Sequence, residues 1–327
     1  LGEIAKLGAQ VGIAKDSLVD FTETVALFAA TTDVTSESAS MMFARIQQMT
    51  DIDSTQFRNL GSAVSELGSN MTATEQEILT VTESIATVAS QAGMTGTAII
   101  GLGAAMASLR IRPELARGAV QRVFLQLSTV VAESGAEMER LAEITGHTTD
   151  ELAAMESSNF DQFIMTVFEG LSRTAESGQN LVPVLRELGI YNTRDADAIA
   201  RLASNYDVLS YAMETAGESF AQGNYLQREA SRIFDTLTAK TQLMSNAWDE
   251  LKFSLVAAIG PLVTWLVEGV TAVIQFVSGS ELLVAVLGRL LIVGGVVAGF
   301  AALVAIVSSA IQAWIALRTV WATAAVA

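Results

Sequence analysis

The residue types that could support catalysis are scarce in this sequence. His147 is the only histidine, and the chain contains no cysteine. A Ser–His–Asp or Cys–His arrangement would have to use His147, and one histidine without thiolates makes a zinc site implausible. Because His147 follows Gly146, we interpret it as the residue that packs back on a helix end after a left-handed glycine. We therefore expect no metal and no cofactor.

Two glycine-containing motifs resemble ligand loops only superficially. The stretch Gly101-Leu-Gly103-Ala-Ala-Met106 resembles a dinucleotide fingerprint, but it ends in methionine and lies inside a helical pattern instead of after a strand. The pairs Glu133-Ser134 and Glu176-Ser177 resemble the catalytic Glu-Ser of lytic transglycosylases, but the glycine-rich substrate loops that should follow are missing. We interpret both pairs as helix ends, and we predict that the chain is not an enzyme.

The composition favours an all-α fold. Hydrophobic residues make up 51% of the chain, charged residues 17%, and only 3 prolines occur. Residues such as Ala, Leu, Glu and Met lose little side-chain freedom in a helix. No sustained run of alternating β-branched and aromatic residues predicts a strand. Two stripes with helical spacing predict a packed core, namely Ile78, Val81, Ile85 and Val88, and Phe160, Phe163, Val167 and Leu171.

Glycines divide the first part of the chain into short helices. A glycine followed by an apolar or partly apolar residue, with a Ser, Thr or Asp at one fixed distance, predicts a helix end and the next helix start. This pattern occurs at Gly12–Asp16, Gly93–Thr97, Gly146–Asp150 and Gly189–Thr193. Capping boxes are predicted at Thr72 with Glu75, at Thr148 with Glu151 and at Asp53 with Gln56. Pro113 fits a first helical turn. We expect these helices to fold back on one another instead of forming a straight rod.

The formal net charge of −16 limits the partners. DNA affinity depends mainly on Lys and Arg, so tight DNA binding is not expected. An acidic wall would instead let DNA pass nearby without sticking to it. No small-molecule substrate is indicated.

Charged residues become rare after Lys252. Leu290 to Leu317 contains none, and this length is sufficient to cross a bilayer. Gly295 and Gly299 have the small-xxx-small spacing that lets membrane helices pack closely. Trp265, Trp314 and Trp321 are expected as anchors at the membrane interface. Glu268 interrupts an apolar stretch, and we interpret it as a helix break or the mouth of a hairpin, although an ionisable residue there can also be functional.

These features predict two regions. Residues 1–252 form an array or bundle of short helices, and residues 253–327 form a hydrophobic, membrane-competent helical hairpin. A buried helix in a soluble oligomer is the alternative for the second region. Leu1 in place of methionine, and an apolar stretch at Ala327, lead us to expect a fragment of a longer protein without a secretory signal in view.

Several blocks, in order, resemble the core region of phage tail tape measure proteins. They are Thr74–Arg112, Glu139–Ala153, Phe163–Ser172, Leu185–Ser204 and Leu226–Lys252, whereas Leu1–Ser69 matches loosely. The resemblance implies a structural protein of the tail tube lumen that sets tail length and leaves ahead of the DNA at infection. It implies tail tube and tail tip proteins as partners, and a place in the virion after assembly in the host cytoplasm.

Together with the apolar end, the resemblance leads to the hypothesis of a homo-oligomer that inserts in the host membrane and helps to form a conduit for DNA. The alternative is a pore-forming toxin or secretion translocator with a hydrophobic hairpin. A membrane-anchored helical signalling protein is a weaker third reading, because it would need long heptads beside the membrane.

Overall fold

The computed structural model describes residues 1–238, and these residues form helices only, with no strand among them. We call this part of the chain the body. The all-α prediction is confirmed for the body, whereas the predicted boundary at Lys252 and the hairpin that follows it lie outside the described residues. The helices are α1 (Gly2–Gln10), the 3-10 turn η1 (Lys15–Ser17), α2 (Leu18–Thr31), α3 (Ser36–Met49), α4 (Phe57–Asn70), α5 (Glu75–Gln91), α6 (Gly96–Ser108), α7 (Pro113–Glu133), α8 (Ala136–Thr145), α9 (Thr149–Ser158), α10 (Phe160–Glu176), α11 (Leu181–Glu187), α12 (Thr193–Ser204), α13 (Tyr206–Gln222) and α14 (Tyr225–Thr238).

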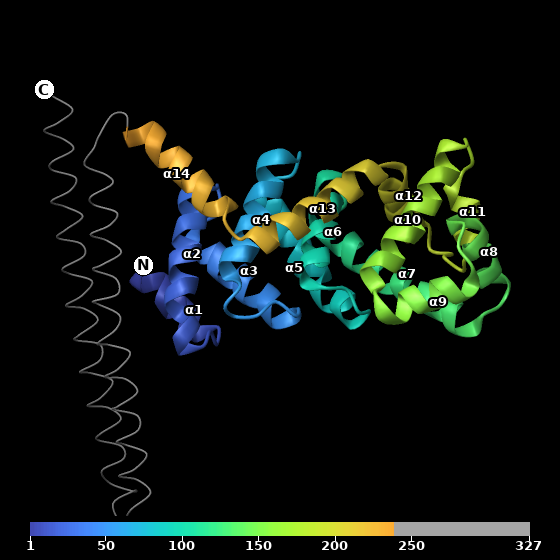
Figure 1. Ribbon diagram of the computed structural model, residues 1–327, viewed down its shortest axis with the longest axis horizontal. Coiled ribbons are helices and arrows are strands. Elements are labelled where there is room, and N and C mark those ends of the chain that lie inside the picture. Colours follow the sequence, from blue (N-terminus) through green and yellow to red (C-terminus); the bar gives the residue numbers. More distant parts are fainter. Residues whose placement is uncertain (239–327) are drawn as a thin grey trace, which may run out of the picture. The chain divides into compact units, whose positions relative to one another are not determined.

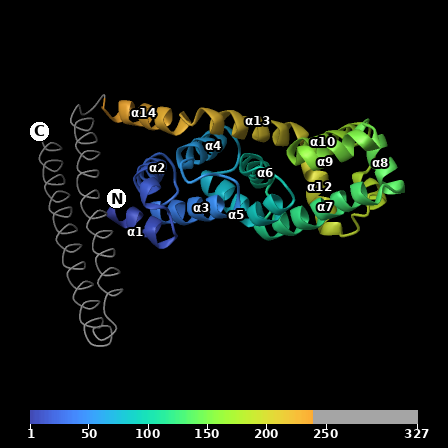
Figure 2. The same cartoon turned by 60° about the horizontal axis from the view of Figure 1, so that its bottom comes forward.

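The chain runs along the body and then returns. Helices α2 to α6 follow one another in neighbouring positions, and α7 to α12 form the far end (Figure 1). Helix α13 then packs across α6 and α4, and α14 packs on α4 and α2 (Figure 2). The returning helices therefore cover elements that lie far earlier in the sequence, as expected for helices that fold back on one another.

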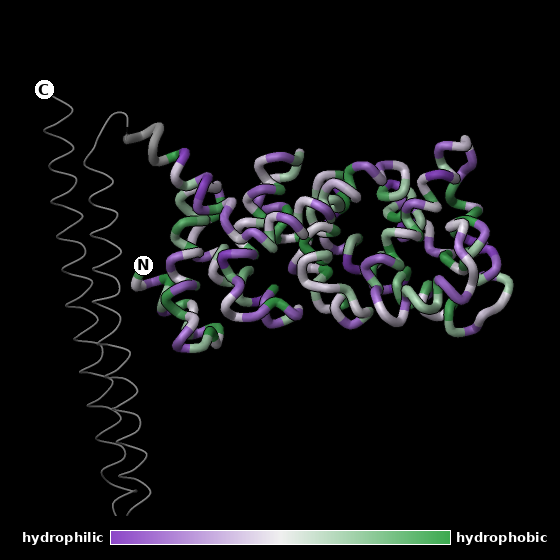
Figure 3. Tube along the Cα trace, viewed as in Figure 1, coloured by the Kyte–Doolittle hydropathy of each residue, from purple (hydrophilic) through white to green (hydrophobic). Residues whose placement is uncertain are grey.

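Both predicted apolar stripes lie in the core. Ile78 and Ile85 of α5 are fully buried, and Phe163 of α10 is too. Along most of the body, hydrophobic and hydrophilic residues are interspersed within the helices (Figure 3), whereas α6 is apolar and buried along nearly its whole length. The interspersed pattern is that of helices that are apolar on one side only.

Many connections between helices also bury one apolar side chain. These residues are Ile13, Val34, Ile52, Ala73, Met94, Ile111 and Ile190. Two of the connections share a further device: the Thr32 and Thr50 hydroxyls each donate to a carbonyl of the helix just ended, and each also accepts an N–H two residues on. The turns are thus fastened both by hydrogen bonds and by a buried side chain.

The predicted glycine helix ends are confirmed. Gly12, Gly93 and Gly189 have φ of 87°, 101° and 80°, and the residue after each donates to the carbonyl five residues back. Gly146 has φ of 74° and closes α8 with one bond to Ala142. Sequence reasoning missed Arg110, which closes α6 in the same way at φ 57° although it is not glycine. This left-handed conformation costs a non-glycine residue about 1–2 kcal/mol.

The predicted cap positions need correction. Helices α6, α9 and α12 are capped by Thr95, Thr148 and Asn192, not by Thr97, Asp150 and Thr193. The turn after the glycine is shorter than the fixed distance assumed, so the cap follows the apolar residue within one or two positions.

Two of the predicted capping boxes also turn out differently. The box at Thr148 and Glu151 is confirmed, but the box of α5 uses Thr74 and Glu77. The Asp53 N–H donates to the Gln56 side chain in the turn before α4, but Gln56 is the N-cap residue and no side chain caps the helix, so the predicted box with Asp53 as cap is wrong. Pro113 does begin α7, as predicted.

Candidate functional site

Helix α6 lies at the centre of the body and is buried on nearly every side. Two of its glycines, Gly101 and Gly103, face different neighbours. A Cβ on Gly101 would come within 2.9 Å of the Met213 Cα of α13, and a Cβ on Gly103 would come within 3.0 Å of the Thr82 Cα of α5 and still nearer to its hydroxyl. The glycine motif that resembles a dinucleotide fingerprint lies inside a helix, as predicted from the sequence, and the structure adds that it makes two close helix contacts.

Two carboxylates from distant elements hold the first turn of α6. Asp161 of α10 accepts hydrogen bonds from the Thr95 N–H at 3.1 Å and the Thr95 hydroxyl at 2.6 Å. Asp51, between α3 and α4, accepts from the Gly96 N–H at 2.5 Å. Carboxylates suit a helix N-terminus, where backbone N–H groups lack partners inside the helix. Burial, with a smaller contribution from the nearby charge of Asp51, raises the pKa of Asp161 above its ordinary value.

The raised pKa gives a pH-dependent prediction for Asp161→Asn. A carboxyl group whose pKa is higher in the folded state makes a contribution to stability that is fully present at pH below its unfolded pKa and is lost as pH rises through the folded pKa. Asparagine keeps an acceptor for Thr95 but does not titrate. The stability of Asp161→Asn relative to the natural chain should therefore rise between about pH 3.5 and pH 7, as measured by urea unfolding. A difference that stays flat over this range would contradict the prediction, and Asp161→Ala, which lacks the acceptor, should be weaker throughout.

Asp195 is the only charged side chain buried within the described residues, with 1% of its surface exposed. It lies in the first turn of α12 and accepts two hydrogen bonds from Arg122 of α7, at 2.5 Å from Nε and 2.6 Å from the terminal nitrogen. This side-on, two-bond geometry is the strong form of an Arg–carboxylate pair. The hydrogen bond to Asp195 raises the pKa of Arg122. The pair fixes α12 against α7 at the far end of the body.

Removing Arg122 should lower the free energy of unfolding more than removing the charge of Asp195. Arg122→Ala leaves the buried Asp195 carboxylate without its partner, and we expect a loss of about 2–3 kcal/mol in the free energy of unfolding. Asp195→Asn leaves Arg122, which is 54% exposed, free to be hydrated, so we expect a smaller loss. Urea unfolding of the two variants and of the double variant would measure both the asymmetry and the coupling. Equal losses in the two single variants would contradict this account.

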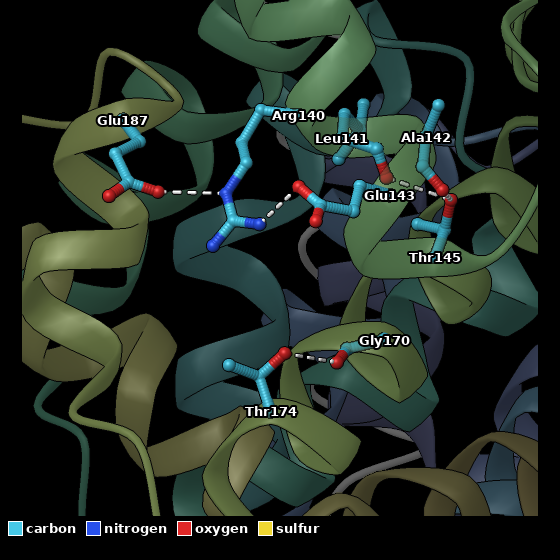
Figure 4. A network of polar contacts seen from close by, with 8 residues as sticks. All are labelled: Arg140, Leu141, Ala142, Glu143, Thr145, Gly170, Thr174 and Glu187. Carbon is cyan, nitrogen blue, oxygen red and sulfur yellow. Dashed lines mark hydrogen bonds and ion pairs between the residues drawn. The ribbon is translucent and has the colours of Figure 1, made fainter.

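A second polar network fastens α8 to its neighbours. The Arg140 guanidinium lies between Glu187 at the end of α11 and Glu143 of its own helix, at 2.8 and 2.5 Å (Figure 4). Arg173 of α10 donates to the Thr145 carbonyl at the end of α8 at 2.7 Å. The groups in this network are paired with one another at the surface, which is an arrangement for positioning helices and not for transferring protons.

The residues considered first for chemistry lie at helix ends. His147 is half-exposed and lies 3.6 Å from Glu151, and Glu133 and Glu176 are the last residues of α7 and α10. No cluster of three metal-binding side chains occurs within residues 1–238. A groove of about 330 Å³ lies between α5 and the α6–α7 turn, and Glu77 and Arg110 pair across that region at 2.7 Å. This volume is at the low end for ligand pockets.

The residues predicted to act in a membrane lie outside the described part. They are Gly295, Gly299, Trp265, Trp314 and Trp321, together with Glu268 and the Leu290–Leu317 run. Among the described helices, none combines the length and the apolar character that a membrane span requires. The membrane prediction therefore stays a prediction. Sequence reasoning missed Arg122–Asp195 and the two α6 carboxylates, because each pair joins residues far apart in the chain.

The family of phage-related minor tail proteins matches residues 1–183, and the chain belongs to this family. It is a protein of the tail tape measure type. The chain is similar to a probable tape measure protein of Halomonas phage phiHAP-1, with 23% identity over 296 residues. The match covers 89% of this chain but 33% of that protein, so the chain spans about a third of the relative's length. No solved structure matches the chain.

Proposed function

We propose that this chain is part of a protein that occupies the phage tail tube, sets tail length and leaves the tube at infection. The observation that carries the proposal is the family match over residues 1–183, joined by the relative named a probable tape measure protein. The folded-back body supports a further point. A segment that sets tail length by its own length must be extended, and the body is folded back on itself. The length-setting segment therefore lies elsewhere in the full protein, and residues 1–238 act near the tail tip.

The charge distribution supports a role in the passage of DNA through the tail. The four basic and four acidic residues after residue 238 cancel, so the whole net charge of −16 lies in the body. A surface of this charge repels the phosphate backbone. DNA leaving the tail would pass such a body without binding to it.

The apolar end supports a role at the host membrane. Residues Leu290–Leu317 carry no charge and are long enough to cross a bilayer. One helix cannot line a pore, so several copies would associate through the Gly295 and Gly299 faces, with Trp265, Trp314 and Trp321 at the interface. The proposed partners are therefore other copies of the chain, the tail tube and tail tip proteins, and the host membrane.

Quantitative mass spectrometry of purified phage particles tests the tail role. Peptides from Thr74 to Lys252 should be present in intact tails and lost from particles whose DNA release has been triggered. A tail sheath or tube peptide from the same samples is the control. Absence of the chain's peptides from intact particles would refute the tail role and favour the pore-forming toxin or translocator.

Dye leakage from liposomes tests the membrane role separately. The full chain should release dye, and replacing both Gly295 and Gly299 with leucine should reduce the release because helices can no longer approach closely. Liposomes that stay intact over the whole pH range tried would refute the conduit but would leave the tail role standing.

A further inference from the structure

Positive charge in the body is concentrated at the start of α7. Residues 110–122 contain four arginines and only one acidic residue, Glu114, although the body as a whole has a strongly negative net charge. Arg117, Gln121 and Leu125 follow one another at four-residue spacing on the outer face of α7. Arg117 and Gln121 are exposed, and Leu125 is 68% exposed. This spacing places them in one row along the helix.

The loop before α12 lies beside the part of α7 that carries this row. Arg122 bonds to Asp195, and Gln126 lies directly against Gly189, so the segment from Gly189 to Asp195 runs beside the α7 turn that carries Leu125.

Tyr191, which is 72% exposed, and the exposed Arg194 lie within that segment. We call Arg117, Gln121, Leu125, Tyr191 and Arg194 the basic stripe. Neither Arg117 nor Arg194 forms an ion pair within residues 1–238.

Helix α13 carries a stripe of opposite charge. Asp207, Tyr211, Glu214 and Glu218 recur at helical spacing and are all exposed, and α13 contains no Lys or Arg. Tyr211 is 45% exposed and lies between carboxylates. We call these four residues the acidic stripe. Its carboxylates form no ion pair with the rest of the described chain.

The two stripes match one another in chemistry as well as in charge. Each has an exposed apolar or aromatic centre with charges of one sign beside it. Among the large hydrophobic side chains exposed in the described chain, only Val19 lies outside the two stripes. Exposed aromatic and arginine side chains of this kind are enriched at protein interfaces. Helices α7 and α13 run along opposite sides of the body (Figure 2), so one copy cannot join its own stripes.

We propose that the acidic stripe of one copy of this chain docks on the basic stripe of a second copy. The contact is heterologous, because it joins two different surfaces, so it leaves one stripe free on each copy and continues to a ring or a filament. It goes beyond the proposed tail function and is separate from the Gly295/Gly299 contact, so either association can fail without the other.

Charge reversal in the full 327-residue chain, kept in a mild detergent, tests this contact by sedimentation velocity over a range of concentrations. Arg117→Glu with Arg194→Glu should weaken association at least about tenfold, and so should Glu214→Lys with Glu218→Lys, since like charges then oppose each other across the interface. A chain that carries all four reversals should recover the association, because the stripes are again complementary.

The control is Lys6→Glu with Lys15→Glu, which changes the net charge as the basic-stripe reversal does but lies outside both stripes, and it should associate like the natural chain. Recovery in the fourfold variant also shows that the substitutions do not unfold the body. The proposal is overturned if the natural chain shows no association, if a stripe reversal has no more effect than the control, or if the fourfold variant stays dissociated. It is also overturned if the basic stripe binds a DNA oligonucleotide that the Arg117→Glu/Arg194→Glu variant releases.

Discussion

Gly103→Ala is expected to lower the free energy of unfolding of the body by about 3 kcal/mol, the upper end of the usual cost of overpacking. The added Cβ would lie 3.0 Å from the Thr82 Cα and closer still to the Thr82 hydroxyl, so α5 and α6 must move apart. Both helices are buried at the centre of the body, where neighbouring packing resists such a shift. Urea unfolding followed by circular dichroism measures the loss.

A matched control lies in α13. Gly217 is also inside a helix, but a Cβ there would meet no atom within 4 Å. Gly217→Ala should therefore stabilise the body by about 0.5–1 kcal/mol, because alanine loses less backbone freedom on folding. If Gly103→Ala stabilised the body as Gly217→Ala does, helix propensity and not the α5–α6 contact would be controlling the result.

Thr82 offers a second check on the same contact. Its hydroxyl is buried and has no hydrogen-bond partner in the described structure, so Thr82→Ala removes a group that contributes little there. Combined with Gly103→Ala, it should restore part of the lost stability, because the nearest clash disappears while the backbone contact at 3.0 Å remains. A double variant as unstable as the sum of the single variants would place the clash elsewhere.

The local features of the fold could be predicted from sequence because they depend on neighbours in the chain. Gly93 and Gly189 adopt the left-handed conformation that an apolar residue after them indicates, and the stripe from Ile78 to Val88 is buried. The cap positions were wrong by one or two residues, since a threonine or asparagine near a helix start can cap at several registers. Only the path of the turn decides between Thr95 and Thr97.

The tertiary contacts could not be predicted, because their partners are distant in sequence and carry no local signal. Asp195 has the position of an ordinary acidic residue in a first helical turn, yet it is buried against Arg122. Gly101 and Gly103 were expected inside a helix, but nothing in the sequence indicated that another helix approaches each of them. Arg110 takes a glycine conformation that no sequence rule indicates.

A chain that ends at Gln179 is expected to lose cooperative folding, although it contains almost all of the family match over residues 1–183. Leu209, Phe220 and Leu226 are buried on the returning helices, and burying each contributes about 1.5–3 kcal/mol. Their sum of about 5–9 kcal/mol is comparable to the whole stability of a typical domain. The chain through Thr238 should show one sharp urea transition, whereas the shorter chain should bind a hydrophobic dye and unfold gradually.

A chain that ends at Asn205 shows whether cooperative folding is lost because α11 and α12 are missing or because α13 and α14 are missing. That chain keeps α12 and the Arg122–Asp195 pair but lacks α13 and α14, so α6 and α4 remain uncovered. In the complete body, the junction between α13 and α14 is anchored on α4 by two hydrogen bonds. The Asn59 amide donates to the Phe220 carbonyl, and the Ser62 hydroxyl accepts from the Leu226 N–H. We therefore expect the Asn205 chain to behave like the shorter one. A sharp transition in it would mean that the returning helices are a removable cover and that the body folds without them.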